Sequence, residues 1–142
     1  MKKLLLITSF LASQLFAVKC TEQQYSPYFT DTNEVRYMYS YTQKTDKSDV
    51  VIDKKSIIYD NENQKIKCWI ISQQINSPTY GNFKIQWEFN LKNNKVRVLC
   101  ASAYNCSGKP IHEESIGDWY DIIPNSGNEH VLESLKEYLK IK

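Results

Sequence analysis

The sequence predicts an α+β fold, an antiparallel β-sheet meander of about five to six strands with a C-terminal amphipathic helix packed on one face. Three observations lead to this prediction. Apolar and polar residues alternate with a period of two in several segments between residues 35 and 123, as side chains do along a strand. Short polar segments separate these runs, as in hairpin connections. Residues 126–142 instead carry apolar side chains at helical spacing.

The first two predicted strands cover residues 35–42 and 50–60. In the first, VRYMYSYT, the alternation places Tyr37, Tyr39 and Tyr41 on one face. The second, VVIDKKSIIYD, is β-branched at both ends and polar in its middle. The tyrosine face is the candidate binding surface of the chain, because tyrosine offers a large contact area at a low cost in conformational entropy. A half-buried sheet face is the other interpretation of the same pattern.

The third predicted strand, KIKCWIIS, is apolar on both faces. Ile66, Cys68 and Ile70 lie on one face, and Trp69 and Ile71 lie on the other. This pattern is typical of a strand at the centre of a sheet that is covered on both sides. We therefore place the strand centrally and interpret Trp69 as a core residue.

The next two strands form the clearest hairpin. FKIQWEFNL, residues 83–91, alternates strictly, with apolar side chains on one face and polar ones, including Glu88, on a wet face. KVRVLCASAY, residues 95–104, returns after a polar turn. Arg97 alternates with apolar residues in this strand, so we expect its side chain to face away from the core.

A two-residue loop formed by Asn93 and Asn94 predicts the register of this hairpin. It pairs apolar residues at each step and places Trp87 opposite Cys100, so that Cys100 is expected on the core face. If the strand stays extended, Cys100 cannot bond to Cys106. Six residues span about 20 Å in a strand, whereas a disulfide needs Cα atoms within about 7 Å.

The C-terminal part predicts one short strand and the helix. After His112–Glu114, which we interpret as an exposed loop, a strand is expected around residues 119–123. Ser126 stands three residues before Glu129, the spacing of a capping box, and Pro124 stiffens the chain before it. The apolar stripe of the helix consists of Val131, Leu132, Leu135, Tyr138 and Leu139. A helix this short is marginal alone, so its stripe is expected to dock on the sheet.

The N-terminus predicts a signal peptide at residues 1–17. Two lysines precede a mostly apolar run that ends before the small residue Ala17, and the run is shorter than the about 20 residues of a membrane span. Cys20 raises the alternative of a lipid anchor, but the lysine directly before it suits that processing badly. We expect an exported product with an N-terminal arm at residues 18–34, a single domain at residues 35–142, and no stable membrane insertion after cleavage.

The charge balance of the processed chain argues against a nucleic-acid partner. Removing residues 1–17 takes away two lysines and no acid, which lowers the basic count from 18 to 16, equal to the 16 acidic residues. A surface that binds nucleic acid needs a clear basic excess. We therefore expect no nucleic acid among the partners.

Four cysteines remain after cleavage, namely Cys20, Cys68, Cys100 and Cys106. An oxidising compartment allows up to two disulfides, and the three full pairings stay open. Buried free thiols are the alternative for Cys68 and Cys100. A zinc site is disfavoured, because the spacings lack the close cysteine pairs of structural zinc sites. No metal and no other cofactor are expected.

No residue set in the sequence predicts a catalytic site. The two histidines are His112, which precedes two glutamates, and His130 in the first turn of the predicted helix. The His-Glu-Glu run is not the H-E-x-x-H zinc motif, and neighbouring side chains of an extended segment point apart. Glycine-rich phosphate loops and nucleophile elbows are missing. A small secreted hydrolase, such as a ribonuclease that combines Glu and His with Arg36 or Arg97, is the alternative to a non-enzyme.

Four stretches carry a family resemblance: VVIDKKSIIYD, CWII, KVRVLCASAY with the later SGKPI, and DWYDIIPNSGNEHVLESL. The residues that carry it are Asp53, Ser56, Ile57, Trp69, Arg97, Gly108, Trp119, Ile122, Pro124, Ser126 and Glu129. Over about residues 35–140 the chain resembles the surface-adhesin protein E-like family of small exported bacterial proteins. The resemblance implies an antiparallel sheet with a helix packed on it, no known catalytic site, and Trp119 as an anchor for the start of the helix.

The namesake of this family is a lipid-anchored adhesin that binds host extracellular proteins and can dimerise, so the resemblance implies a protein partner and a homodimer. The chain departs from it in two ways, since it has no convincing lipid-attachment motif and no cysteine in the C-terminal helix, where the namesake bonds helix to sheet. Both departures count against adhesion at the cell surface. We predict a non-catalytic binding or envelope-associated protein, either periplasmic or secreted to the cell surface. A periplasmic structural or inhibitor-type protein is the alternative.

Overall fold

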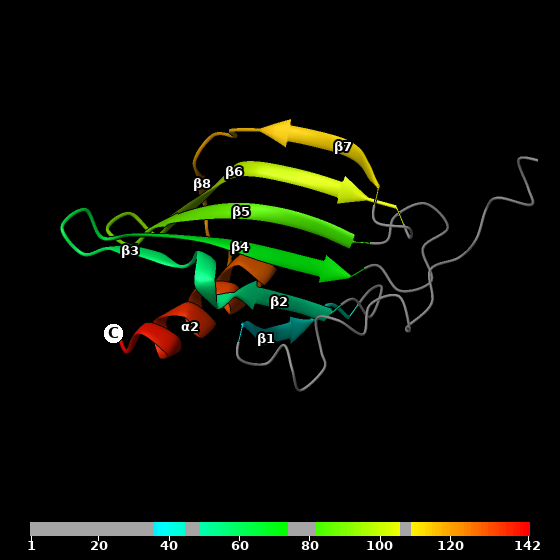
Figure 1. Ribbon diagram of the computed structural model, residues 1–142. Coiled ribbons are helices and arrows are strands. Elements are labelled where there is room, and N and C mark those ends of the chain that lie inside the picture. Colours follow the sequence, from blue (N-terminus) through cyan, green and yellow to red (C-terminus); the bar gives the residue numbers. More distant parts are fainter. Residues whose placement is uncertain (1–35, 45–48, 74–81, 106–108) are drawn as a thin grey trace, which may run out of the picture.

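An eight-stranded antiparallel sheet and one C-terminal helix form the fold, which confirms the predicted α+β class (Figure 1). The computed structural model describes residues 36–44, 49–73, 82–105 and 109–142, so the predicted signal peptide, the N-terminal arm, Cys20, Cys106 and Gly108 lie outside the described residues. The strands are β1 (Tyr37–Thr42), β2 (Asp49–Asp53), β3 (Ile58–Asp60), β4 (Lys65–Gln73), β5 (Asn82–Asn90), β6 (Lys95–Tyr104), β7 (Pro110–Ser115) and β8 (Tyr120–Asp121).

The sheet is a meander with the order β1-β2-β4-β5-β6-β7, in which β3 pairs with β4 and β8 pairs with β6. The central place predicted for KIKCWIIS is confirmed, because β4 lies between β5 on one side and β2 and β3 on the other. The run VVIDKKSIIYD is divided into β2 and β3 by η3 (Lys54–Ser56), one turn of 3-10 helix. Ser56 fixes this turn to the centre of the sheet, because its Oγ accepts a hydrogen bond of 2.7 Å from the Trp69 backbone N–H.

The helix α2 (Gly127–Leu139) lies on one face of the sheet, as predicted (Figure 1). We call this face the helix face and the opposite one the second face. The core between α2 and the sheet consists of Val50, Ile52, Ile66, Cys68, Ile70, Trp87, Phe89, Val96, Ile122, Val131, Leu132 and Leu135. Leu135 and Phe89 are fully buried there, and burial of each such side chain contributes about 1.5–3 kcal/mol. Tyr138, which the stripe included, is instead 47% exposed.

The start of α2 carries the predicted cap with one difference in the second half of the capping box. Ser126 Oγ accepts from the Glu129 N–H at 3.4 Å, as expected. The Glu129 carboxylate accepts from the N–H of Asn125 at 2.6 Å, one residue before the cap. The Ser126 N–H is already bound to the carbonyl of Ile123 in a turn over Pro124 and Asn125. Asn125 has a φ of 62°, and proline followed by a residue at positive φ is typical of a type II turn.

The predicted register of the β5–β6 hairpin is wrong, and so is the expected core position of Cys100. The loop has four residues, because Asn90 pairs with Lys95. Trp87 therefore lies opposite Val98, and a β-bulge then makes Leu99 an extra residue in β6. Since one extra residue moves the following side chains to the other face, Cys100 lies on the second face and is half-buried.

The segment His112–Glu114 is a strand and not the exposed loop that we expected. It forms the middle of β7, which pairs with β6 and places the backbone of His112 opposite Ala103. The isoleucine before the histidine is 43% exposed. The local sequence misled because a run of charged residues is typical of a loop, whereas charges also suit a sheet edge, where they discourage pairing with other chains. The short strand expected around residues 119–123 is confirmed as β8.

Candidate functional site

The predicted tyrosine surface is divided between the two faces of the sheet. A β-bulge between Tyr39 and Tyr41 makes Ser40 an extra residue in β1, and Tyr41 consequently pairs with the core residue Val50 on the helix face. Tyr37 and Tyr39 remain on the second face. The prediction that all three tyrosines share a face is therefore wrong, because the sequence pattern assumed an unbroken alternation.

Of the two tyrosines that stay on the second face, Tyr37 lies beside an arginine that is held by an acid. The Arg36 guanidinium lies 5.2 Å from the centre of the Tyr37 ring. It also donates two hydrogen bonds, of 2.9 and 3.2 Å, to the carboxylate of Asp53. Tyr39 is 58% exposed. This end of the second face thus offers the exposed phenol of Tyr39 and, at Tyr37, an arginine whose geometry is already set.

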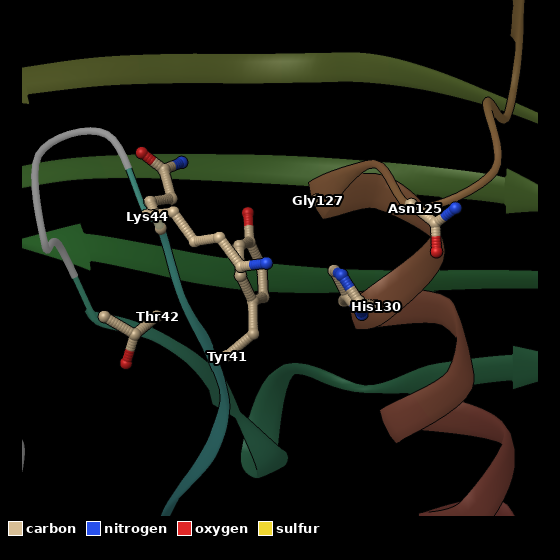
Figure 2. Close-up of a pocket in the computed structure, with 7 residues that line it drawn as sticks. Tyr41, Thr42, Lys44, Asn125, Gly127 and His130 are labelled. Atoms are coloured by element: carbon tan, nitrogen blue, oxygen red, sulfur yellow. The ribbon is translucent and has the colours of Figure 1, made fainter.

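The start of α2 and the end of β1 enclose a hollow of about 680 Å³. Figure 2 shows Tyr41 and Lys44 on its β1 side, and Asn125, Gly127 and His130 on its α2 side. Its volume lies in the range of about 300–1,000 Å³ that is usual for small-molecule pockets. Polar side chains from two elements therefore line a space of ligand size.

Tyr41 connects the two sides of this hollow. Its ring lies 5.2 Å from the His130 ring, centre to centre, with 34° between the ring planes. Its hydroxyl oxygen occupies the place that a Cβ on residue 127 would take, so any residue other than glycine requires Tyr41 to shift. Beside it, Ser40 shares a hydrogen bond of 2.9 Å with Ser134 in α2. The bulge that turned Tyr41 inward thus also docks the helix on β1.

The hollow does not assemble an acid–base pair around its histidine. Within the described part of the chain, the His130 ring contacts Tyr41 and makes no hydrogen bond or ion pair. A general base needs a partner that fixes its orientation and tautomer. The arrangement offers hydrogen-bonding groups and the ammonium of Lys44, which suit binding better than proton transfer.

A second and more tightly built group of side chains surrounds Glu88 on the second face. Glu88 was predicted on a wet face, yet it is only 2% exposed. Its carboxylate accepts a hydrogen bond of 3.0 Å from Arg97 in β6 and lies 3.5 Å from the ammonium of Lys65 in β4. Opposite charges from three neighbouring strands thus meet at one buried carboxylate, and each fixes the position of the others.

Trp119 covers this charged group. The Arg97 guanidinium lies 4.5 Å from the centre of its ring, and the Lys65 ammonium 5.7 Å, both within the range of cation–π attraction. The strand β8 places Tyr120 opposite Val96, so the alternation of side chains directs Trp119 to the second face and Ile122 to the core. Ile122 is 6% exposed and is the residue of this segment that contacts the core under α2.

Next to this group lies a cavity of about 220 Å³, lined by Ile58, Asp60, Asn63, Lys65, Lys67 and Glu88. Ile58 is 62% exposed at its rim. Asp60 accepts hydrogen bonds from the backbone and side chain of Asn63, and these bonds hold the pKa of the Asp60 carboxyl below its usual value. We call Ile58, Lys65, Lys67, Glu88, Arg97 and Trp119 the Glu88 cluster.

Sequence reasoning placed Arg97 correctly, away from the core, but missed the other charged members of the Glu88 cluster. The assumed strand register did not show that Glu88 lies opposite both Arg97 and Lys67. Opposite charges on facing strands were the available signal, and the two-residue loop assumed for the hairpin hid it.

The described cysteines are free thiols. Cys68 is buried on the helix face, and Cys100 is half-buried on the second face. Burial raises the pKa of the Cys68 thiol to about 12, which keeps it protonated and unreactive at neutral pH. The strand β6 ends at Tyr104, so the extended geometry that excludes a bond between Cys100 and Cys106 does not continue to residue 106.

The described residues hold no group of three or more His, Cys, Asp or Glu side chains placed to bind a metal ion. No helix among them has the length and apolar character needed to cross a membrane.

Comparisons with family models, with curated proteins and with solved structures found no match to this chain. The geometry of the described residues therefore carries the functional argument.

Proposed function

We propose that this chain is a non-catalytic exported protein that binds another protein through the Glu88 cluster. One observation carries the proposal: Trp119 is held over Arg97 and Lys65, and Lys65 also lines the cavity that has the exposed Ile58 at its rim. Tryptophan and arginine dominate the binding energy of protein interfaces, and an exposed apolar residue on the adjoining cavity favours contact with a partner.

The internal bonding of the cluster supports this proposal, because it fixes the side chains before a partner arrives. Glu88 holds both cations, so little conformational entropy remains to be lost on association. The Nε atom of Arg97 is also shielded from solvent and has no hydrogen-bond partner among the described residues. A buried polar atom without a partner is rare in folded proteins.

The order of charge, apolar run and small residue at 1–17 supports export. Membership of the surface-adhesin protein E-like family is part of the proposal, since a sheet with a C-terminal helix is what that resemblance implies. Labelling of intact cells distinguishes the two locations: a protein that is labelled only after the outer membrane is broken acts in the periplasm and is not an adhesin.

The test is crosslinking in the native host with a photoreactive phenylalanine analogue in place of Ile58. The matched control carries the analogue at Tyr138, which is 47% exposed on α2. We expect a discrete protein adduct from position 58 and none from position 138. Trp119→Ala should reduce the adduct strongly, since loss of an interface hot spot weakens binding by about 30-fold or more.

Adducts of equal yield at both positions, or an adduct unchanged by Trp119→Ala in a protein that keeps its circular dichroism spectrum, would contradict the proposed site. Turnover of RNA, peptide or glycan substrates by the purified protein would contradict the non-catalytic part of the proposal.

A further inference from the structure

The cavity of the Glu88 cluster contains a lysine, Lys67, that forms no ion pair with the residues the structure describes. Within the described residues, the ammonium of Lys67 makes no hydrogen bond or ion pair. It lies opposite Glu88 in β5 and Ile58 in β3. The Glu88 carboxylate is already bound to Arg97 and Lys65.

The other acid of the cavity is engaged as well. Both oxygens of the Asp60 carboxylate accept hydrogen bonds from Asn63, at 3.0 and 2.7 Å. Asp60, Lys65, Lys67, Glu88 and Arg97 together carry three positive and two negative formal charges. The surplus is one positive charge, and Lys67 is the cation left to carry it.

The size of the cavity indicates what kind of group can enter. A volume of about 220 Å³ is below the range of about 300–1,000 Å³ that cofactors and small molecules usually occupy. It suits one side chain of a bound polypeptide. The half-buried position of Lys67 strengthens a charge-assisted hydrogen bond there, because the local dielectric constant is lower than that of water.

We propose that the cavity receives the carboxylate of an Asp or Glu side chain from an extended acidic segment of the partner protein, bound by the ammonium of Lys67. Apolar residues next to that acid lie against Ile58 at the rim. This inference rests on the proposed function, since it names the chemistry of the partner at the same surface.

The first test uses the crosslinker at position 58 in the native host. Lys67→Gln removes the positive charge and keeps the length and polarity of the side chain. The matched control is Lys84→Gln, which removes one charge elsewhere on the second face, where Lys84 lies over the Tyr104 ring. We expect Lys67→Gln to lower the adduct yield about tenfold and Lys84→Gln to leave it unchanged.

An adduct that survives Lys67→Gln but is lost with Trp119→Ala would overturn the acidic-segment inference and leave the proposed function standing. An adduct absent from every variant with the crosslinker at position 58 would overturn the proposed function itself.

The second test uses heptapeptides selected from a random display library on the purified full chain. We expect selected sequences with one recurrent Asp or Glu flanked by apolar residues. Changing that acid to its amide should weaken binding about tenfold, and Lys67→Gln should do the same. The two changes together should weaken it by about tenfold and not about a hundredfold, because they remove one interaction.

The inference would be overturned if the amide change and Lys67→Gln together weakened binding by the product of their separate effects. Selected peptides without an acid would overturn it as well. So would tighter binding of a polyphosphate or an acidic polysaccharide than of any selected peptide, since that result assigns the free charge of Lys67 to a different class of partner.

Discussion

Replacing Gly127 by alanine should destabilise the protein, although the same change in an isolated helix stabilises it. Alanine favours a helix over glycine by up to about 1 kcal/mol. In this fold, however, a Cβ at position 127 would overlap the hydroxyl oxygen of Tyr41 and lie 2.9 Å from its Cζ. Tyr41 cannot move freely, because its ring stacks on His130 and packs against the core.

The magnitude follows from the two opposing terms. Forcing an extra methyl group into a packed contact costs about 1–3 kcal/mol, which exceeds or matches the helical gain. We expect the free energy of unfolding to fall by up to about 2 kcal/mol. Urea unfolding followed by tryptophan fluorescence measures this as a lower midpoint with an unchanged slope.

A double-mutant cycle tests whether Tyr41 is the cause. Gly127→Ala in a Tyr41→Leu background should be neutral or stabilising, because the atoms that it meets are gone. Tyr41→Phe should relieve only part of the cost, since Cζ remains. An equal loss of stability in the wild-type and Tyr41→Leu backgrounds would refute the reasoning, because the cost would then not come from this contact.

Three further changes probe the helix cap, the second face and the buried thiol. Ser126→Ala should cost about 1 kcal/mol in urea unfolding, and Ser126→Asp should restore it, because either oxygen can accept from the Glu129 N–H. Glu88→Gln should cost about 1–3 kcal/mol, since Arg97 and Lys65 lose their counter-charge. Burial raises the pKa of Cys68 from 9.0 to about 12, so the thiol favours folding below pH 9 and its contribution is lost as the pH rises towards 12. Between pH 9 and pH 12 each unit of pH should lower the free energy of unfolding by about 1.4 kcal/mol through this thiol. The Cys68→Ala variant should lack this contribution.

Each of these expectations has its own control. For the cap, equal stability of the alanine and aspartate variants at position 126 would show that the serine oxygen does not matter. Glu113→Gln, at an exposed acid in β7, should change the stability by no more than about 0.5 kcal/mol, and an equal effect at Glu88 would contradict the burial argument. Parallel alkaline curves for the wild type and Cys68→Ala would show that Cys68 does not titrate on unfolding.

The fold was predictable from the sequence because its two periodicities are long and clean. The alternation in β5 and the spacing of Val131, Leu132 and Leu135 in α2 each predict one apolar face. Two apolar faces of this kind have to pack on each other to leave water. Short polar connections then permit little besides an antiparallel meander.

The two side chains assigned to the wrong face have one physical origin, a single extra residue within a strand. Ser40 in β1 and Leu99 in β6 are such residues, and each moves the side chains beyond it to the other face. Tyr41 and Cys100 were misplaced for this reason. A bulge is stabilised by tertiary contacts, such as the hydrogen bond between Ser40 and Ser134, and local sequence does not contain those contacts.

The candidate site was less predictable than the fold, because a strand pattern says which face a side chain takes and not what covers it. Glu88 was correctly assigned to the polar face of β5. Its burial depends on Arg97 and Lys65 from the two neighbouring strands and on Trp119 from β8. Only the full register brings these residues together.

The buried charges of the Glu88 cluster carry a desolvation cost, in free energy of folding, that apolar residues in the same place would not carry. Burying a carboxylate among cations commonly gives no net stability relative to apolar side chains of similar volume, and here one buried nitrogen of Arg97 also has no hydrogen-bond partner among the residues that the structure describes. The helix face of the same strands buries apolar side chains instead, and Phe89 and Val96 are fully buried there. The second face uses charge, an indole ring and an exposed isoleucine where stability alone would favour a plain apolar or fully solvated surface. That contrast within one sheet is the physical reason for proposing that the second face binds a partner, whereas α2 closes the core.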